Sequence, residues 1–119
     1  IFAYTRAKGV TWLHKELMKM PKKQGILESK IEVWLNDQIK KIGGRSYKFV
    51  SPGNPGVPDR IYLLPDGEVY FVELKRVIGK LSNVQMWQRD QIRRMGCNYR
   101  VIYGMDQAKD FIKELKDES

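Results

Sequence analysis

The sequence has 119 residues, of which 42% are apolar and 30% are charged, a balance that favours a folded globular chain over a disordered one. Its 22 Lys and Arg residues outnumber its 14 Asp and Glu residues, and the net charge of +8 favours either binding to a polyanion or general solubility. One cysteine and one histidine exclude a disulfide framework and a metal site built from several thiolates or imidazoles, so any catalysis must use carboxylates, lysine and a hard metal ion.

Residues 1–25 form a basic N-terminal extension. Apolar residues at helical spacing predict a short amphipathic helix over residues 11–20, which the polar, Pro- and Gly-containing residues 21–25 end. This extension is interpreted as a DNA-contacting arm, a dimer contact or a solvated tail, and its pattern leaves the three alternatives open. Residues 26–119 are predicted to form a single domain.

The first strong element of that domain is a helix. It is indicated by an apolar stripe at spacings of four, four, four and three residues, formed by Leu27, Ile31, Leu35, Ile39 and Ile42. Gly43 and Gly44 follow the stripe directly, and glycine is the residue that most often ends a helix.

Three strands are predicted next, over residues 46–50, 59–64 and 68–74, where β-branched and aromatic residues gather. Residues 65–67 read Pro-Asp-Gly, a tight-turn sequence, so the second and third strands should form a hairpin. A helix over residues 82–95 with Ser82 as its N-cap, a strand over 99–103 and a helix over 107–115 complete the chain. The order predicts an α/β fold with a mixed central sheet flanked by helices.

The chemistry is predicted to lie at one end of the hairpin. Residues 52–58 contain three prolines and two glycines, a constrained loop that leads into Asp59 at the start of a strand. A hairpin centred on Asp66 places Asp59 directly opposite Glu73, and Lys75 points to the same face as Glu73. Two facing carboxylates repel each other unless a cation lies between them, and a hard divalent ion prefers such oxygen ligands.

The alternative interpretation is an edge hairpin with exposed charges, because a Glu-x-Lys pair is common in strands. The match in register between Asp59 and Glu73, after a rigid loop and in a basic chain poor in histidine, favours the catalytic interpretation.

These residues resemble the signature of the PD-(D/E)XK nuclease superfamily, through Pro58-Asp59 and the run Glu73-Leu74-Lys75. More narrowly, the sequence resembles the VRR-NUC branch, including standalone phage-type members similar to junction resolvases. This narrower resemblance rests on residues 48–53, 56–60 and 72–75 together with Gln85, and it covers the chain from about Glu28 to the last helix. It implies a restriction-endonuclease-like core.

The resemblance also implies roles for single residues. Asp59 and Glu73, with the backbone carbonyl of Leu74, would bind Mg²⁺ or Mn²⁺, and Lys75 would orient or polarise the attacking water. A glutamate on the first helix would contribute a metal or water contact. Spacing favours Glu28 over Glu32 for this role, although an acid in the first turn is also favoured by the helix dipole alone. Gln85 would support the site, the alternative being a partly exposed polar residue. A phosphate track is predicted from Arg76, Lys80, Arg89 and Arg93.

The function implied is hydrolysis of DNA phosphodiester bonds with one or two metal ions, at four-way (Holliday) junctions. Cutting two strands needs two active sites, so a homodimer is expected. A flap or end-processing nuclease, a catalytically inactive DNA-binding module and a protein-interaction domain are the alternatives. The sequence has no apolar run long enough to cross a bilayer and no signal peptide, so we expect no membrane partner and a cytoplasmic location in a bacterial or phage-infected cell.

Overall fold

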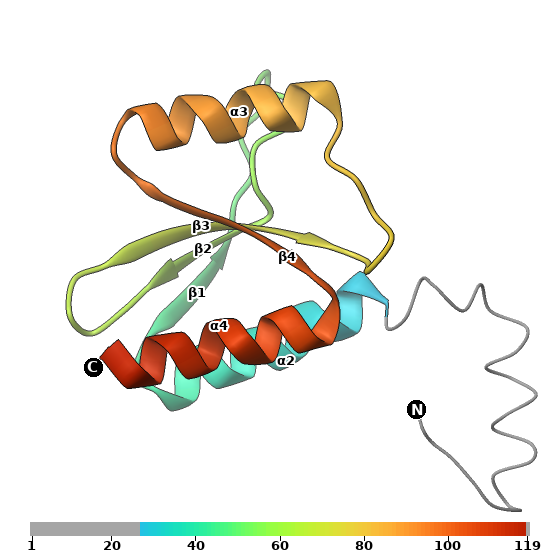
Figure 1. The fold of residues 1–119 in the computed structure, drawn as a ribbon. Coiled ribbons are helices and arrows are strands. Elements are labelled where there is room, and N and C mark those ends of the chain that lie inside the picture. Colours follow the sequence, from blue (N-terminus) through green and yellow to red (C-terminus); the bar gives the residue numbers. More distant parts are fainter. Residues whose placement is uncertain (1–26, 119) are drawn as a thin grey trace, which may run out of the picture.

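The computed structural model describes residues 27–118, and the helix predicted over residues 11–20 lies outside this range. Seven elements follow one another along the described chain (Figure 1): α2 (Glu28–Lys41), β1 (Arg45–Lys48), β2 (Arg60–Leu63), β3 (Val69–Lys75), α3 (Asn83–Arg94), β4 (Asn98–Tyr103) and α4 (Gly104–Glu118). No helix in this part of the chain is long and apolar enough to cross a membrane.

The four strands form one mixed sheet in the order β1-β2-β3-β4. The pairs β1–β2 and β2–β3 are antiparallel, whereas β3 and β4 run parallel. Arg60 pairs with Val72 and Leu63 with Val69, so the hairpin is centred where the Pro-Asp-Gly turn predicts. The predicted α/β class and element order are confirmed, with the last helix beginning three residues earlier than predicted, directly after β4.

The apolar stripe of α2 is buried as its spacing predicts. Ile31, Leu35 and Ile39 are fully buried, and Ile42 forms the C-cap of the helix. Gly43 follows with φ of 89°, a conformation that a side chain strains, so the helix ends at the predicted glycine pair. A Cβ at Gly44 would lie 2.7 Å from the carbonyl oxygen of Leu63, which shows how closely this turn packs on β2.

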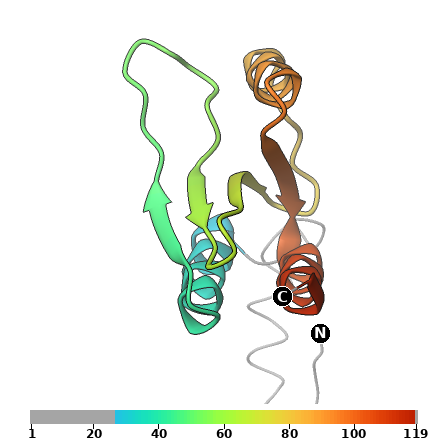
Figure 2. The ribbon, with the colours of Figure 1, turned by 90° about the vertical axis from the view of Figure 1, so that its left-hand side faces the viewer.

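The apolar core lies between one face of the sheet and the two helices α2 and α4, which run side by side beneath it (Figures 1 and 2). Alternate strand residues reach this face, among them Tyr62, Tyr70 and Val72. Phe111 of α4 stacks near Tyr62 and meets Tyr70 edge to face, with ring centroids 6.4 and 5.3 Å apart. The main apolar core therefore packs against only one face of the sheet.

The opposite face of the sheet is covered only in part, by α3, which packs mainly against β4 (Figure 2). No residue of α3 is fully buried. Strand alternation directs Ile61, Phe71, Glu73 and Tyr99 to this face. Glu73, which is predicted to belong to the site, thus lies on the side of the sheet that does not form the main core.

We expect Leu35→Ala to lower the free energy of unfolding by about 2–5 kcal/mol, because the side chain is 0% exposed and its removal leaves a cavity between α2 and the sheet. Val33→Ala on the same helix is the control, since Val33 is 69% exposed and its loss should change stability by less than about 0.5 kcal/mol. Urea unfolding of both variants measures the difference, and equal effects would contradict the packing described above.

Candidate active site

A constrained loop presents Asp59 at the start of β2. Pro58 is fully buried, and the backbone N–H of Phe49 donates to the carbonyl of Asp59 at 2.9 Å. Gly56 has φ of 86° and lies so close to α3 that a Cβ would be 2.8 Å from the backbone of Val84. The loop is therefore held between the sheet and the N-terminal turn of α3, as its proline and glycine content predicts.

Asp59 and Glu73 lie next to each other, as the hairpin register predicts. The backbone N–H of Leu74 donates to Asp59 Oδ2 at 2.9 Å, which holds this carboxylate beside β3. Glu73 is only 3% exposed, and its Oε2 accepts a hydrogen bond from Gln85 Nε2 at 3.1 Å. Lys75 Nζ lies 3.7 Å from the same oxygen. The structure therefore brings together four of the residues expected at the site.

The electrostatics of Glu73 reflect this crowding. Burial is the largest cause that raises its pKa, followed by the nearby negative charge of Asp59, and the pKa reaches about 8 from an ordinary value of 4.5. The charge of Lys75 opposes the increase, and that of Glu28 adds a smaller increase. A buried carboxyl group beside a second one is thus costly to ionise, and a cation between them would remove that cost.

The donor set fits a hard divalent cation. Glu73 Oε1 is buried and has no hydrogen-bond partner among the described residues, so a lone pair of this oxygen remains for a ligand. Within the described chain no three acidic, histidine or cysteine side chains gather into a cluster that could hold a metal. A cation between Asp59 and Glu73 would therefore need backbone carbonyl or water ligands in addition, which is how Mg²⁺ is usually held.

The two candidate acids on α2 lie in different surroundings. Glu32 Oε2 accepts a hydrogen bond from Arg60 Nη1 at 3.1 Å, on the face of the sheet opposite Glu73. Glu28 is exposed on the first turn of α2, and its charge contributes to the raised pKa of Glu73. Of the two acids, only Glu28 is among the charges that raise the pKa of Glu73.

Gln85 has two structural roles at once. Its backbone N–H donates to Ser82 Oγ at 3.2 Å, and its side-chain Oε1 accepts from the backbone N–H of Ser82 at 2.9 Å. This capping box starts α3, and it leaves Nε2 directed at Glu73. Ser82 is the N-cap predicted from the sequence, whereas the double use of Gln85 was not predicted, although the Ser-x-x-Gln spacing signals it.

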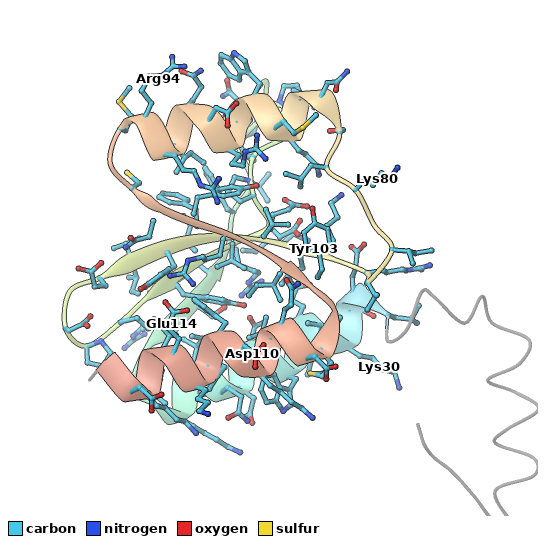
Figure 3. The ribbon with its side chains drawn as sticks, in the orientation of Figure 1. Lys30, Lys80, Arg94, Tyr103, Asp110 and Glu114 are labelled. Atoms are coloured by element: carbon cyan, nitrogen blue, oxygen red, sulfur yellow. The ribbon has the colours of Figure 1, made fainter. Side chains whose placement is uncertain are left out.

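The basic residues expected to follow the DNA backbone are spread along α3 and the loop before it. Arg89 Nε lies 2.9 Å from Asp90 Oδ1, and the guanidinium of Arg93 sits 5.4 Å above the ring of Tyr99. Lys80 projects from the connection between β3 and α3 (Figure 3), and Arg76 lies at the start of that connection. Arg89 and Arg93 therefore border the side of the sheet that carries Glu73 rather than the apolar core.

Tyr99 is a residue of the site that the sequence reasoning missed. It lies in β4 on the face of Glu73, beneath Arg93, and its buried hydroxyl has no hydrogen-bond partner among the described residues. Burial raises the pKa of Tyr99, and the charge of Glu73 raises it further, so the hydroxyl stays a neutral donor. Alternation along residues 98–103 was the available signal, because it places Tyr99 and Glu73 on one face.

A mixed sheet flanked by helices, with an aspartate entering one strand and Glu-x-Lys ending the next, defines the restriction-endonuclease-like class of α/β proteins. The chain is 44% identical over 77 residues to "Putative nuclease p44" of Acyrthosiphon pisum secondary endosymbiont phage 1, covering 65% of this chain and 81% of that protein. It matches a solved structure described as "VRR_NUC domain" with a TM-score of 0.69 and 26% identity, covering 72% of this chain and 94% of that one. No family model matches the sequence. The chain belongs to the VRR-NUC family of nucleases.

We expect Glu73→Gln to stabilise the metal-free protein increasingly as pH rises from 5 to 8. Over this range the unfolded chain ionises Glu73 near pH 4.5 while the folded chain keeps it protonated up to about pH 8, so wild-type stability falls with rising pH. The slope from one such group is at most about 1.4 kcal/mol per pH unit. Melting temperatures of both proteins in EDTA measure the difference, and parallel pH curves would contradict the described environment of Glu73.

Proposed function

We propose that this nuclease hydrolyses DNA phosphodiester bonds at a Mg²⁺- or Mn²⁺-dependent site formed by Asp59, Glu73 and Lys75. The observation that carries the proposal is the buried Glu73 carboxyl group, crowded by Asp59 and left with one unpartnered oxygen. Such an arrangement is unfavourable by itself and becomes favourable with a bound cation. The phage relative, which carries the name of a nuclease, supports the same reaction.

Each residue then has a separate task. Asp59 and Glu73 hold the cation, helped by the backbone carbonyl of Leu74, and Glu28 contributes an outer contact. When bound, the cation polarises the phosphate and lowers the pKa of water. Lys75 carries a positive charge beside Glu73, where it orients the attacking water and stabilises charge that develops on the phosphate. Gln85 holds Glu73 in place through its amide hydrogen bond.

The reaction proposed is the attack of a water oxygen on phosphorus with cleavage of one phosphorus–oxygen bond, which leaves one strand end with a phosphate and the other with a hydroxyl. We propose branched DNA, in particular the four-way junction, as the substrate. The basic residues beside the site support a DNA substrate in general, and a flap or end-processing nuclease would use the same residues. Retention of both carboxylates and Lys75 speaks against a catalytically inactive DNA-binding module.

We further propose a homodimer, formed through the part of the sheet that α3 does not cover. Leu63 and Val69 lie opposite each other on this face in neighbouring strands, and each is more than a third exposed. Contiguous exposed apolar side chains on a sheet indicate a contact surface. A second copy would cover them and supply the second active site that paired cutting requires.

We expect cleavage of labelled DNA in the presence of Mg²⁺ or Mn²⁺ and none in EDTA. Asp59→Asn and Lys75→Ala should each lower the rate constant by about 100-fold or more while DNA binding persists, because the first removes a ligand of the cation and the second removes the charge beside the attacking water. The assay compares linear, flapped and four-way DNA of the same arm sequence with each metal.

Asp37→Asn is a control for Asp59→Asn with the same change of charge, on the exposed surface of α2, and it should cut as the wild type does. Failure of the intact wild-type protein to cut any of these substrates with either metal would refute the proposed reaction. Cleavage of the flap but not the four-way junction would refute only the proposed substrate.

We expect Val69→Glu to convert a dimer into a monomer, because a charge in an apolar contact between two copies would be buried opposite Leu63. Light scattering during size-exclusion chromatography measures the mass. Val33→Glu, at an exposed position of α2, is the control and should leave the mass unchanged. A monomeric wild-type protein at working concentration would count against a preformed pair.

A further inference from the structure

A hollow lies beside the edge strand β1, and none of Asp59, Glu73 and Lys75 lines it. It has a volume of about 610 Å³, and its wall includes Asn36 and Lys40 of α2, Arg45, Ser46 and Tyr47 of β1, and Arg60 of β2. We call it the α2–β1 cleft. Its volume lies in the range of about 300–1,000 Å³ that is typical of ligand sites. The proposed nuclease chemistry assigns no role to it.

Hydrogen bonds within the wall use its side-chain acceptors. Ser46 Oγ donates to Asn36 Oδ1 at 2.8 Å, and the hydroxyl of Tyr62 donates to the same oxygen at 3.2 Å. Both lone pairs of this amide oxygen are therefore occupied. Arg60 donates to Ser46 Oγ from Nε and Nη2, and to Glu32 Oε2 from Nη1. Arg60 is itself only 11% exposed, so the wall is a built network rather than a set of mobile surface groups.

What the side chains of the wall still offer is hydrogen-bond donors and positive charge. Within the described chain, Asn36 Nδ2 has no acceptor, and Lys40 and Arg45 have no carboxylate partner. Arg60 keeps N–H groups beyond the three that it donates to Ser46 and Glu32. No aspartate or glutamate lines the cleft. A ligand that only accepts hydrogen bonds and carries negative charge matches this wall, and phosphate has this chemistry.

We propose that the α2–β1 cleft binds a backbone phosphate of the DNA substrate, in a segment of DNA separate from the one that is cut. Arg60 follows Asp59 directly, and strand alternation turns the two side chains to opposite faces of the sheet. Because the side chains of Asp59 and Arg60 face opposite sides of the sheet, we assign the cleft to a second arm of a branched DNA rather than to the segment that is cut. This assignment rests on the proposed nuclease function and specifies how a branched substrate is held.

The first test uses Lys40→Gln/Arg45→Gln in an Asp59→Asn background, so that DNA is bound but not cut. Fluorescence anisotropy in EDTA, at several salt concentrations, compares a four-way junction with a linear duplex of the same arm sequence. We expect about tenfold weaker binding to the junction and a salt dependence whose slope falls by about two, one for each lost phosphate contact. Binding to the linear duplex should change by less than about threefold. The control Lys109→Gln/Lys113→Gln removes the same charge from exposed positions of α4 and should change neither affinity.

The second test is Asn36→Asp, which keeps an oxygen for Ser46 and Tyr62 and replaces the free N–H donors of the amide with a carboxylate oxygen. In the otherwise wild-type enzyme we expect KM for the junction to rise about tenfold while kcat stays within twofold, because the cleft does not touch the reacting phosphate. A variant that merely unfolds would lose kcat as well, and circular dichroism identifies that case. In that case the binding measurements with Lys40→Gln/Arg45→Gln are the test of the proposal.

Equal losses in the cleft variants and in the α4 control would overturn the proposal, as would equal losses for junction and linear duplex. An NMR titration with inorganic phosphate that shifts Asn36 and Arg60, together with unchanged DNA affinity, would overturn it in favour of a small-anion site. If the wild-type protein cuts no DNA but the cleft variants still bind DNA more weakly, the nuclease function is refuted. The assignment of a phosphate to the cleft is then supported. A wild-type protein that binds no DNA would overturn both.

Discussion

The contact between the Asp59 and Glu73 carboxyl groups is the interaction on which the rest of the site depends. Their approach follows from the register of the β2–β3 hairpin, which the tight turn at residues 65–67 determines. A slip of one residue would turn Glu73 toward the apolar core, where nothing could compensate its charge. The same register sets Lys75 beside Glu73, and the backbone N–H of Leu74 beside Asp59. A single turn in the chain thereby positions the groups that we propose for catalysis.

One face of the sheet forms the apolar core, and the other face carries the candidate active site. One face packs against α2 and α4 with residues such as Leu35, Tyr62 and Phe111, and it contains the main apolar core. The other face carries Glu73 and Tyr99 under α3, a helix without a fully buried residue. Because buried charge reduces stability, placing it away from the main core leaves that core intact. The unfavourable free energy of the carboxyl pair thus arises in a region to which α3 adds few buried apolar contacts.

Much of the fold and of the site could be predicted from the sequence, and the parts that could not have a common physical origin. The stripe of α2, the hairpin register and the pairing of Asp59 with Glu73 depend on spacing along one local segment, which a sequence displays directly. The Arg60–Ser46–Asn36 network joins residues from three separate elements, and no local sequence pattern indicates it. The choice between Glu28 and Glu32 also depended on packing, because Arg60 engages Glu32 from the far side of the sheet. Tertiary contacts of this kind become visible only when the strands are in place.

Arg60 connects these observations, since it stands at the boundary between the two faces. Asp59 and Arg60 are neighbours in the chain, and strand alternation sends one side chain to the carboxyl pair and the other to the network behind it. Fixing Arg60 through Glu32 and Ser46 therefore also restrains the backbone that presents Asp59. The same guanidinium supplies positive potential close behind a site that must accept a polyanion. A single Asp-Arg step thus links the position of a carboxylate on one face to a hydrogen-bonded network on the other.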